Sequence, residues 1–223
     1  MKRRAYCAVH SVLLISVALM LGGCATDKSY DYAAFMQSKP KSIVVPPPLN
    51  LSPDIRATYS MLATVTRPLA ESGYYVLPVA LVDQTFRENG VTEPGEMHQI
   101  PPAKLAEIFG ADAALYISIE EYGAKYMVVS SEVIVAANAR LIDTRTGQLL
   151  WEGKARASGA ENQDSSGGVA ALLVKALVSQ VVNSIGDQGY PVARMTSFRL
   201  LSARPGGLLP GPRSPEYAKV VGQ

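Results

Sequence analysis

The position of Cys24 decides how much of this 223-residue chain is available to fold. It follows the basic residues Lys2-Arg3-Arg4 and the apolar run VLLISVALML at 12–21. A helix needs roughly 20 apolar residues to cross a bilayer, so this run is too short for a membrane span and has the length of an export signal. The folded part of the protein is therefore expected after Cys24.

The residues Leu21-Gly22-Gly23-Cys24 are typical of a cleavage site before an acylated cysteine. The two glycines allow the chain to enter a peptidase in an extended form, and the sequence resembles the lipobox of bacterial lipoproteins. We predict a signal peptide over residues 1–23, cleavage between Gly23 and Cys24, a covalent lipid on Cys24 and no other cofactor. Ordinary secretory cleavage beside an incidental cysteine is the alternative.

Removal of residues 1–23 changes the charge balance. Three of the 21 Lys and Arg residues leave with the signal, so 18 remain against 19 Asp and Glu. No basic excess is left, and we expect no nucleic-acid partner. Cys7 also leaves and Cys24 carries the lipid, so no thiol remains for a disulfide even in an oxidising compartment. The fold must therefore hold by packing alone.

The same removal restricts the chemistry. His98 becomes the only histidine, whereas zinc sites usually draw on several His and Cys ligands, and Ser-His or Cys-His nucleophiles need an oriented imidazole. The sequence contains no G-x-S-x-G, H-E-x-x-H, P-loop or G-x-G-x-x-G motif. We predict no catalytic residue and no metal site, and chemistry by carboxylates alone stays open.

The mature chain divides into three segments by composition. Residues 24–41 are polar without a sustained hydrophobic period and are predicted to be the lipid anchor and a tether. Residues 42–200 form the globular domain, and the Pro- and Gly-rich residues 201–223 form a tail that is either disordered or docked. Three side chains of this tail are candidate contacts with a partner or with the chain's own domain: Leu208, Leu209 and Tyr217.

The first half of the domain alternates strands and helices. Residues 42–45 predict a buried strand ended by three prolines, and 74–79 predict a second short strand. Ser52-Pro53 predicts the start of a helix that is kinked or broken at Pro68 and ends at Gly73. The predicted inward stripe of this helix contains Ile55, Tyr59, Leu62, Val65 and Leu69.

Two more helices follow, one over 81–88 and one that opens at Pro101-Pro102, with a loop over 91–100 between them. The inward residues of the second helix are predicted to be Leu105, Ile108 and Phe109. Beyond it, three stretches of alternating apolar residues predict strands over 115–119, 133–141 and 149–157. A final amphipathic helix over 168–185, ended by Gly186, Gly189 and Pro191, is predicted to cover the sheet.

This element order predicts an α/β (α+β) domain with a single mixed sheet. Helical crossovers make the N-terminal strands parallel neighbours, and the last three strands form an antiparallel meander with helices packed on the sheet. The hairpin turn at 143–147 is stabilised by Asp143, beside an exposed Arg145. Trp151 is predicted in the core.

Two further features invite functional interpretations. Glu120 and Glu121 are adjacent on a strand, so their side chains are expected on opposite faces, where they cannot form a catalytic pair. His98 lies in a loop with Glu93 and Glu96, and we expect a surface imidazole rather than a metal ligand.

Four stretches carry a family resemblance. They are TRPLAESGYYVLPVALVDQTFRENG (66–90), AKLAEIFGADAALYISIEEYG (103–123), ARLIDTRTGQLLWEGKARAS (139–158) and GLLPGPRSP (207–215). They resemble an outer-membrane lipoprotein family that includes a genome-derived Neisseria antigen, across nearly the whole mature chain. The hairpin and the strand-helix order are also similar to the periplasmic domain of the curli secretion channel lipoprotein and to the N-terminal domain of the translocation protein TolB.

This resemblance implies an α/β domain tethered to the outer membrane and facing the periplasm, in a family whose activity is not established. Ala25 follows Cys24 where an aspartate would retain a lipoprotein in the inner membrane. Members are often encoded beside a curli-channel-like lipoprotein, which implies envelope proteins as partners. Exposure at the cell surface and the oligomeric state stay open.

Two classes of function remain. We favour a non-catalytic protein-interaction or assembly module, working with a curli-channel-like envelope or secretion complex. One alternative is a regulator of peptidoglycan synthesis, which the short tether disfavours. The other is an enzyme acting on envelope glycans, which would need two acidic groups facing one cleft.

Overall fold

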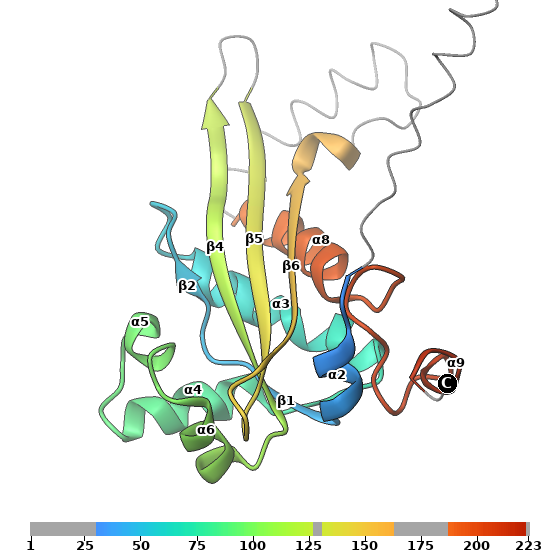
Figure 1. Ribbon diagram of the computed structural model, residues 1–223. Helices are drawn as coiled ribbons and strands as arrows, with labels where there is room; N and C mark the ends of the chain where they lie inside the picture. Colours follow the sequence, from blue (N-terminus) through green and yellow to red (C-terminus); the bar gives the residue numbers. More distant parts are fainter. Residues whose placement is uncertain (1–29, 127–130, 163–186, 222–223) are drawn as a thin grey trace, which may run out of the picture. The chain divides into compact units, whose positions relative to one another are not determined.

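The alternating apolar stretches of the sequence form one sheet. The computed structural model describes residues 30–126, 131–162 and 187–221. Its strands are β1 (Ser42–Val44), β2 (Leu49–Asn50), β3 (Tyr75–Val76), β4 (Ala113–Tyr126), β5 (Ser131–Asp143) and β6 (Leu149–Ser158). The sheet order is β3-β1-β4-β5-β6, and β2 pairs with β4 off this path (Figure 1).

The pairing directions confirm the predicted mixed sheet. Strand β1 is parallel to both β3 and β4, and helices lie in the connections, as parallel neighbours require. Strands β4, β5 and β6 form the antiparallel meander. The short strand β2, which follows the three prolines, was not predicted and pairs in parallel with Ser118 and Ile119 of β4.

Helices surround this sheet on both faces. They are α2 (Ala33–Ser38), α3 (Ala57–Glu71), α4 (Val79–Glu88), α5 (Pro94–Met97), α6 (Pro102–Phe109), α8 (Gly189–Leu201) and α9 (Tyr217–Val220), with a 3₁₀ turn, η1 (Gly159–Asn162). The described residues from Asp31 onward belong to one compact unit. Within the described ranges, no helix combines the length and the apolar character that crossing a membrane would take.

The main core lies between the meander and the helices α3 and α8, which pack against each other on one face (Figure 1). Trp151 is 1% exposed, which confirms it as a core residue. Its ring lies over Gly153, where an added Cβ would be 2.3 Å from the Trp151 ring. The other buried residues of the meander on this face include Leu115, Ile117, Ile119, Val135, Ala137, Ala139 and Leu141.

Helix α3 begins later than predicted. The Asp54 side chain accepts a hydrogen bond from the Arg56 backbone N–H (2.9 Å), and the helix starts at Ala57 rather than at Ser52-Pro53. Ile55 is therefore outside the helix and 90% exposed, and Tyr59 is 46% exposed. The helix also continues past Pro68 to Glu71. The buried stripe consists of Ala57, Thr58, Met61, Leu62, Thr64, Val65, Pro68 and Leu69.

Helix α8 replaces the predicted C-terminal helix as the described cover of the sheet. The predicted helix over 168–185 lies outside the described residues. Gly189 and Pro191 were interpreted as helix-ending residues, but they stand in the first turn of α8. Proline is tolerated there because the first N–H groups of a helix have no intrahelical acceptor.

A second core forms on the opposite face, where α4, α5 and α6 cover β1 and the start of β4. Part of the predicted loop over 91–100 is helix α5, and the predicted strand over 74–79 is shorter because α4 begins at Val79. Ile108 is 46% exposed, so its predicted inward position is wrong. The buried members of this core are Val44, Val82, Phe86, Met97, Leu105, Ala111 and Ala114.

Both ends of the predicted domain extend further than the sequence indicated. Phe35 of α2 is 1% exposed, and α2 packs on β6, so the folded unit includes part of the predicted tether over 24–41. The tail is docked on its own domain. The Tyr74 hydroxyl donates to the Leu209 carbonyl (2.6 Å), and the Gly211 N–H donates to the Ser72 carbonyl (2.8 Å).

Candidate functional site

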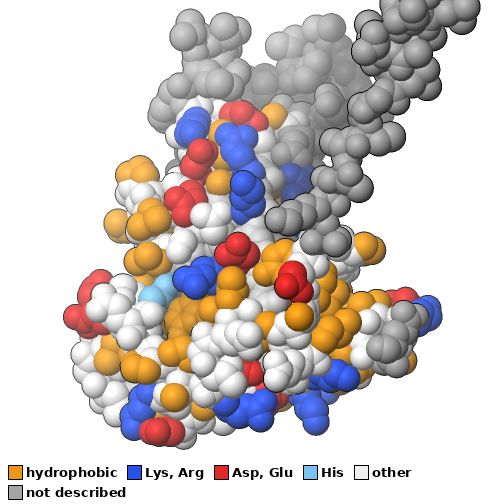
Figure 2. All heavy atoms as spheres, in the orientation of Figure 1, with side chains coloured by type: hydrophobic (Ala, Val, Ile, Leu, Met, Phe, Trp, Pro, Cys, Tyr) orange, Lys and Arg blue, Asp and Glu red, His pale blue; other side chains and the backbone are white. Residues whose placement is uncertain are grey.

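The described residues cover only part of the sheet face opposite α3 and α8. Helices α4 to α6 lie over its β1 end, and the remaining side chains along β4, β5 and β6 reach solvent, a surface we call the open face. Figure 2 shows basic and acidic side chains together along these strands, above a region of hydrophobic side chains. The exposed polar residues of the open face are Glu120, Asn138, Arg140, Glu152, Lys154 and Arg156.

A groove of about 390 Å³ lies where the α5–α6 connection meets the open face. We call it the sheet-face groove, and its volume is within the range of small-ligand sites. Its lining combines a few polar side chains with apolar walls and contains no Asp or Glu. The lining residues are His98, Gln99, Ile100, Pro101, Pro102, Tyr116, Ser118, Asn138, Arg140, Ile142 and Gly147.

The floor of the groove is set by the strand register. Tyr116 of β4 is paired with Arg140 of β5, and Ser118 is paired with Asn138. Because side chains two apart along a strand share a face, these four side chains point to the same side of the sheet. Arg140 is exposed and forms no ion pair with any other described residue, although Glu152 of β6 lies opposite it in the register.

His98 forms part of the groove wall and is not the surface imidazole predicted. Its Nε2 lies 2.9 Å from the Pro47 carbonyl oxygen, and its ring packs edge-on against Tyr116 with 5.3 Å between centroids. Burial lowers the pKa of His98, although the hydrogen bond to Pro47 acts in the opposite direction. The imidazole is therefore neutral near neutral pH. Among the described residues, no cluster of His, Cys, Asp and Glu could hold a metal ion.

The two adjacent glutamates do not lie on opposite faces. A bulge between Ile119 and Glu121 adds a residue to β4, which turns both side chains toward the open face. The Asn138 amide donates to Glu120 (2.8 Å), and Glu121 forms ion pairs with Lys125 (2.9 Å) and Arg156 (3.6 Å). The hydrogen bond from Lys125 is the main reason that the pKa of Glu121 is lowered. Each glutamate therefore has its own polar partner.

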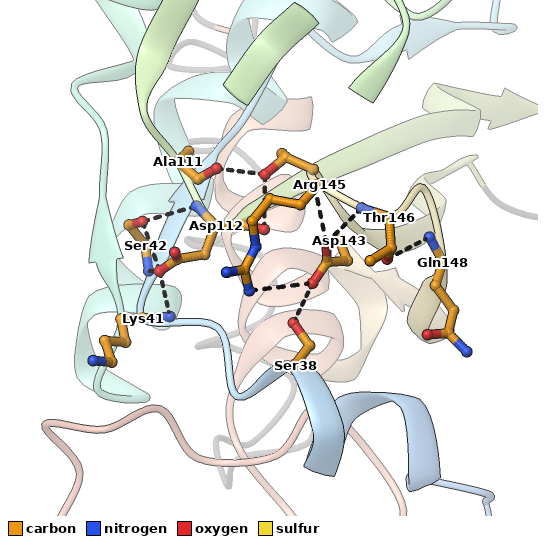
Figure 3. A network of polar contacts seen from close by, with 10 residues as sticks. Ser38, Lys41, Ser42, Ala111, Asp112, Asp143, Arg145, Thr146 and Gln148 are labelled. Carbon is orange, nitrogen blue, oxygen red and sulfur yellow. Dashed lines mark hydrogen bonds and ion pairs between the residues drawn. The ribbon is translucent and has the colours of Figure 1, made fainter. Parts of the chain in front are cut away.

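A polar network fixes the end of the sheet beside the groove (Figure 3). Asp143 is 2% exposed, and its carboxylate accepts hydrogen bonds from the Ser38 hydroxyl (2.5 Å) and from the backbone N–H groups of Arg145 and Thr146 (both 2.9 Å). This confirms Asp143 as the residue that stabilises the turn. The turn carries Gly147, so the network holds one end of the sheet-face groove in place.

The same network joins the N-terminal segment to the connection between α6 and β4. Asp112 Oδ2 accepts hydrogen bonds from the backbone N–H groups of Lys41 (2.9 Å) and Ser42 (3.1 Å). The Thr144 hydroxyl donates to the carbonyl oxygens of Ala111 (2.5 Å) and Asp112 (2.9 Å). Three segments distant in the sequence therefore meet at this end of the sheet.

The substitution Asp143→Asn is expected to lower the free energy of unfolding by about 2–4 kcal/mol at pH 7, because a buried carboxylate loses its charge-assisted hydrogen bonds. Burial raises the pKa of Asp143, but the hydrogen bonds from Ser38, Thr146 and Arg145 outweigh it and lower the pKa. This stabilisation is therefore present above the unfolded pKa, near 4, and is lost as the pH falls through the folded value.

Urea denaturation of both proteins from pH 3 to pH 7 measures this difference. Arg145→Gln is the matched control, because the Arg145 side chain is exposed and lies 4.0 Å from the Asp143 carboxylate, while the backbone N–H that donates to Asp143 at 2.9 Å is kept in the variant. A difference between wild type and Asp143→Asn that is constant with pH would contradict the role of the ionised carboxylate.

The predicted contact residues of the tail lie mostly inside the fold. Leu208 is 0% and Leu209 5% exposed, so both side chains pack on the chain's own domain. Tyr217 is half-buried in α9. A second groove of about 500 Å³ separates this tail from the ends of α3 and α8. Its lining residues are Glu71, Ser72, Ser202, Ala203, Arg204, Pro205, Leu209, Pro210, Ser214, Glu216 and Val220.

The predicted lipidation and cleavage site, Gly23 and Cys24, lies outside the described residues. The sequence does not predict the sheet-face groove, although part of the groove is visible in its pattern. Asn138 and Arg140 alternate with small and apolar residues on a predicted strand, so they mark a polar face. Nothing in the sequence indicates that His98 and the prolines of α6 stand beside them.

Comparisons with known proteins give close relatives over nearly the whole chain. A family described as "Putative lipoprotein GNA1162-like" matches residues 30–213. The "Putative lipoprotein NMB1124/NMB1162" of Neisseria meningitidis serogroup B is 44% identical over 205 residues, which cover 91% of this chain and 95% of the relative.

Solved structures include similar proteins. The crystal structure of lipoprotein GNA1162 from Neisseria meningitidis is 47% identical with a TM-score of 0.53, over 65% of this chain and 99% of that chain. The PelC dodecamer from Paraburkholderia phytofirmans is 15% identical with a TM-score of 0.43, over 79% of this chain and 93% of that chain.

Proposed function

Because the chain belongs to the GNA1162-like lipoprotein family, we propose that it is a lipid-anchored protein of the outer membrane that acts by binding other envelope proteins. The family membership agrees with the resemblance inferred from the four sequence stretches. Family membership shows the class of protein, and the arrangement of the site supports the proposed mode of action.

Anchoring through Cys24 keeps the domain close to the membrane. Six residues lie between Cys24 and Asp31, the first residue of the folded unit, and the seven Cα-to-Cα steps from one to the other span at most about 25 Å when fully extended. A regulator of peptidoglycan synthesis that reaches through the periplasm would need a longer tether. This length supports partners at or near the same membrane, such as a curli-channel-like lipoprotein.

The open face with its groove is the observation that carries the proposed binding function. The strands β4 to β6 are backed by α3 and α8, and the polar network fixes the turn at their end, so the surface is rigid before any partner binds. A rigid surface with apolar walls and a few convergent polar groups is typical of a binding site.

The glutamates of the open face argue against carboxylate chemistry. A glycosidase needs one carboxyl group with a raised pKa as general acid, facing a second across a cleft. Glu121 instead has a lowered pKa and two cationic partners. This arrangement supports a structural role for Glu121 and favours the binding module over the enzyme.

Site-specific photocrosslinking in intact cells tests this function with the full-length lipidated protein. A photoreactive residue at Gln99, exposed on the groove wall, or at Lys154, exposed on the open face, is expected to capture an envelope protein, with a curli-channel-like lipoprotein as the leading candidate. The matched control is Ala63, exposed on α3 behind the sheet. Capture from Ala63 alone would contradict the open face as the site.

Absence of any captured envelope protein from all three positions, in cells where a known lipoprotein complex is captured, would refute the proposed function.

A further inference from the structure

We infer that the sheet-face groove binds an acidic side chain, Asp or Glu, carried by an extended peptide segment of the partner. This inference rests on the proposed binding function and adds the chemistry of the ligand. It comes from the charge, the hydrogen-bonding groups and the walls of the groove.

The charge of the groove belongs to Arg140 alone. No carboxylate is among the lining residues, and the lowered pKa of His98 leaves the imidazole neutral. Glu152 lies beside Arg140 on β6 but is not part of the lining, and the described residues place no ion pair on the Arg140 guanidinium. A planar guanidinium matches a carboxylate through two parallel hydrogen bonds.

Neutral polar groups stand beside this cation. Ser118 and Asn138 form the next pair along the floor, and Gln99 is exposed on the wall. Hydroxyl and amide side chains can both donate and accept hydrogen bonds, which suits the N–H and C=O groups of a peptide backbone. One cation among neutral lining residues also disfavours a phosphate-rich ligand, which draws on several cations.

The walls favour a chain with apolar side chains next to the acidic one. Ile100, Pro101 and Pro102 border one side, and Tyr116 and Ile142 border the strands. The two prolines carry no backbone N–H, so this wall offers packing surface with few competing donors. Apolar contact would then supply affinity, and Arg140 would select the carboxylate.

Binding of defined peptides to the purified full-length lipidated protein in detergent tests the inference. The probes are an array of nonapeptides with acetylated and amidated ends, in which each sequence with a central Glu has partners with Gln and Lys at that position. We expect the Glu peptides that bind to lose at least tenfold in affinity when Glu becomes Gln. Higher salt should weaken the Glu peptides selectively.

Three variants make the test specific. Arg140→Glu is expected to lose the Glu peptides and to bind the Lys partners instead, while Arg140→Lys keeps the charge without the planar fork and should bind Glu peptides more weakly than wild type. Arg194→Glu is the matched control, a charge reversal at an exposed arginine of α8 behind the sheet, and should leave the peptide preference unchanged. Far-UV circular dichroism checks that all three remain folded.

Equal binding of Glu and Gln peptides by the wild type would overturn the inference, as would an unchanged acidic preference in Arg140→Glu. Binding only of peptides with a free C-terminal carboxylate, or only of anionic lipid vesicles or glycans, would also overturn it. If photocrosslinking from Gln99 still captures the partner in Arg140→Glu cells, the proposed binding function stands while the acidic ligand is wrong.

Discussion

Replacing Cys24 with serine is expected to move almost all of the protein from the membrane fraction to the soluble periplasmic fraction. Serine provides no thioether for the lipid, and the described domain has no helix that could replace the anchor. Acyl chains contribute about 0.8 kcal/mol of membrane affinity per buried CH₂, so loss of the lipid removes most of the attachment. Membrane fractionation and mass spectrometry of the mature protein measure the change.

The wild-type mass should include the acyl modification and begin at Cys24. Ser29→Ala, in the same segment, is the matched control and should remain in the membrane fraction. An unmodified amino terminus in the wild type, or membrane association unchanged by Cys24→Ser, would contradict lipidation.

Replacing Gly73 with alanine is expected to lower the free energy of unfolding by about 2–5 kcal/mol and to release the tail. Gly73 has a φ of +95°, and an added Cβ would lie 2.4 Å from Ser214 N and 2.8 Å from the Gly211 carbonyl oxygen. These are backbone atoms of the docked tail, held by hydrogen bonds to Ser72 and Gly73, so they cannot move aside without losing that docking.

Gly90→Ala separates steric overlap from backbone strain. Gly90 has a similar φ of +82°, but no atom lies within 4 Å of its added Cβ, so this variant should lose only about 1–2 kcal/mol. Urea denaturation compares the two stabilities, and limited trypsin digestion at Arg213 reports tail release. Equal losses in both variants, without faster cleavage of the Gly73→Ala tail, would contradict the docking of the tail on α3.

The meander could be predicted because the alternation of buried and exposed side chains in a strand is visible in its local sequence. Side chains of β4 to β6 alternate between the core and the open face, so Leu115, Ile117 and Ile119 repeat at every second position. The turn at Asp143 was also visible, since a carboxylate that accepts nearby backbone N–H groups stabilises turns within a few residues. Such features depend on neighbours in the sequence.

Other features depend on tertiary contacts, which the hydrophobic periodicity of the sequence does not reveal. The helical period of α3 was visible, but the turn at Asp54 moved its start and left Ile55 outside. The sequence predicts Glu120 and Glu121 on opposite faces of the sheet, but the bulge between Ile119 and Glu121 places both side chains on the same face. One extra residue in a strand changes the face of every residue that follows it. Phe35 gave no repeating pattern, and its burial depends on α2 packing on β6.

The sequence by itself determined the mixed sheet with its meander and the family, and it predicts an export signal with a lipid on Cys24 that would leave no free thiol. The tertiary structure alone decided that the tail docks on α3, that α8 covers one face, and that the other face stays open around Arg140. The physical reason is that an apolar pattern says which side of an element avoids water, but not which distant segment covers it. The Tyr74 hydroxyl, for example, donates a hydrogen bond to the Leu209 carbonyl, 135 residues away in the sequence, and only the assembled fold brings these two groups together.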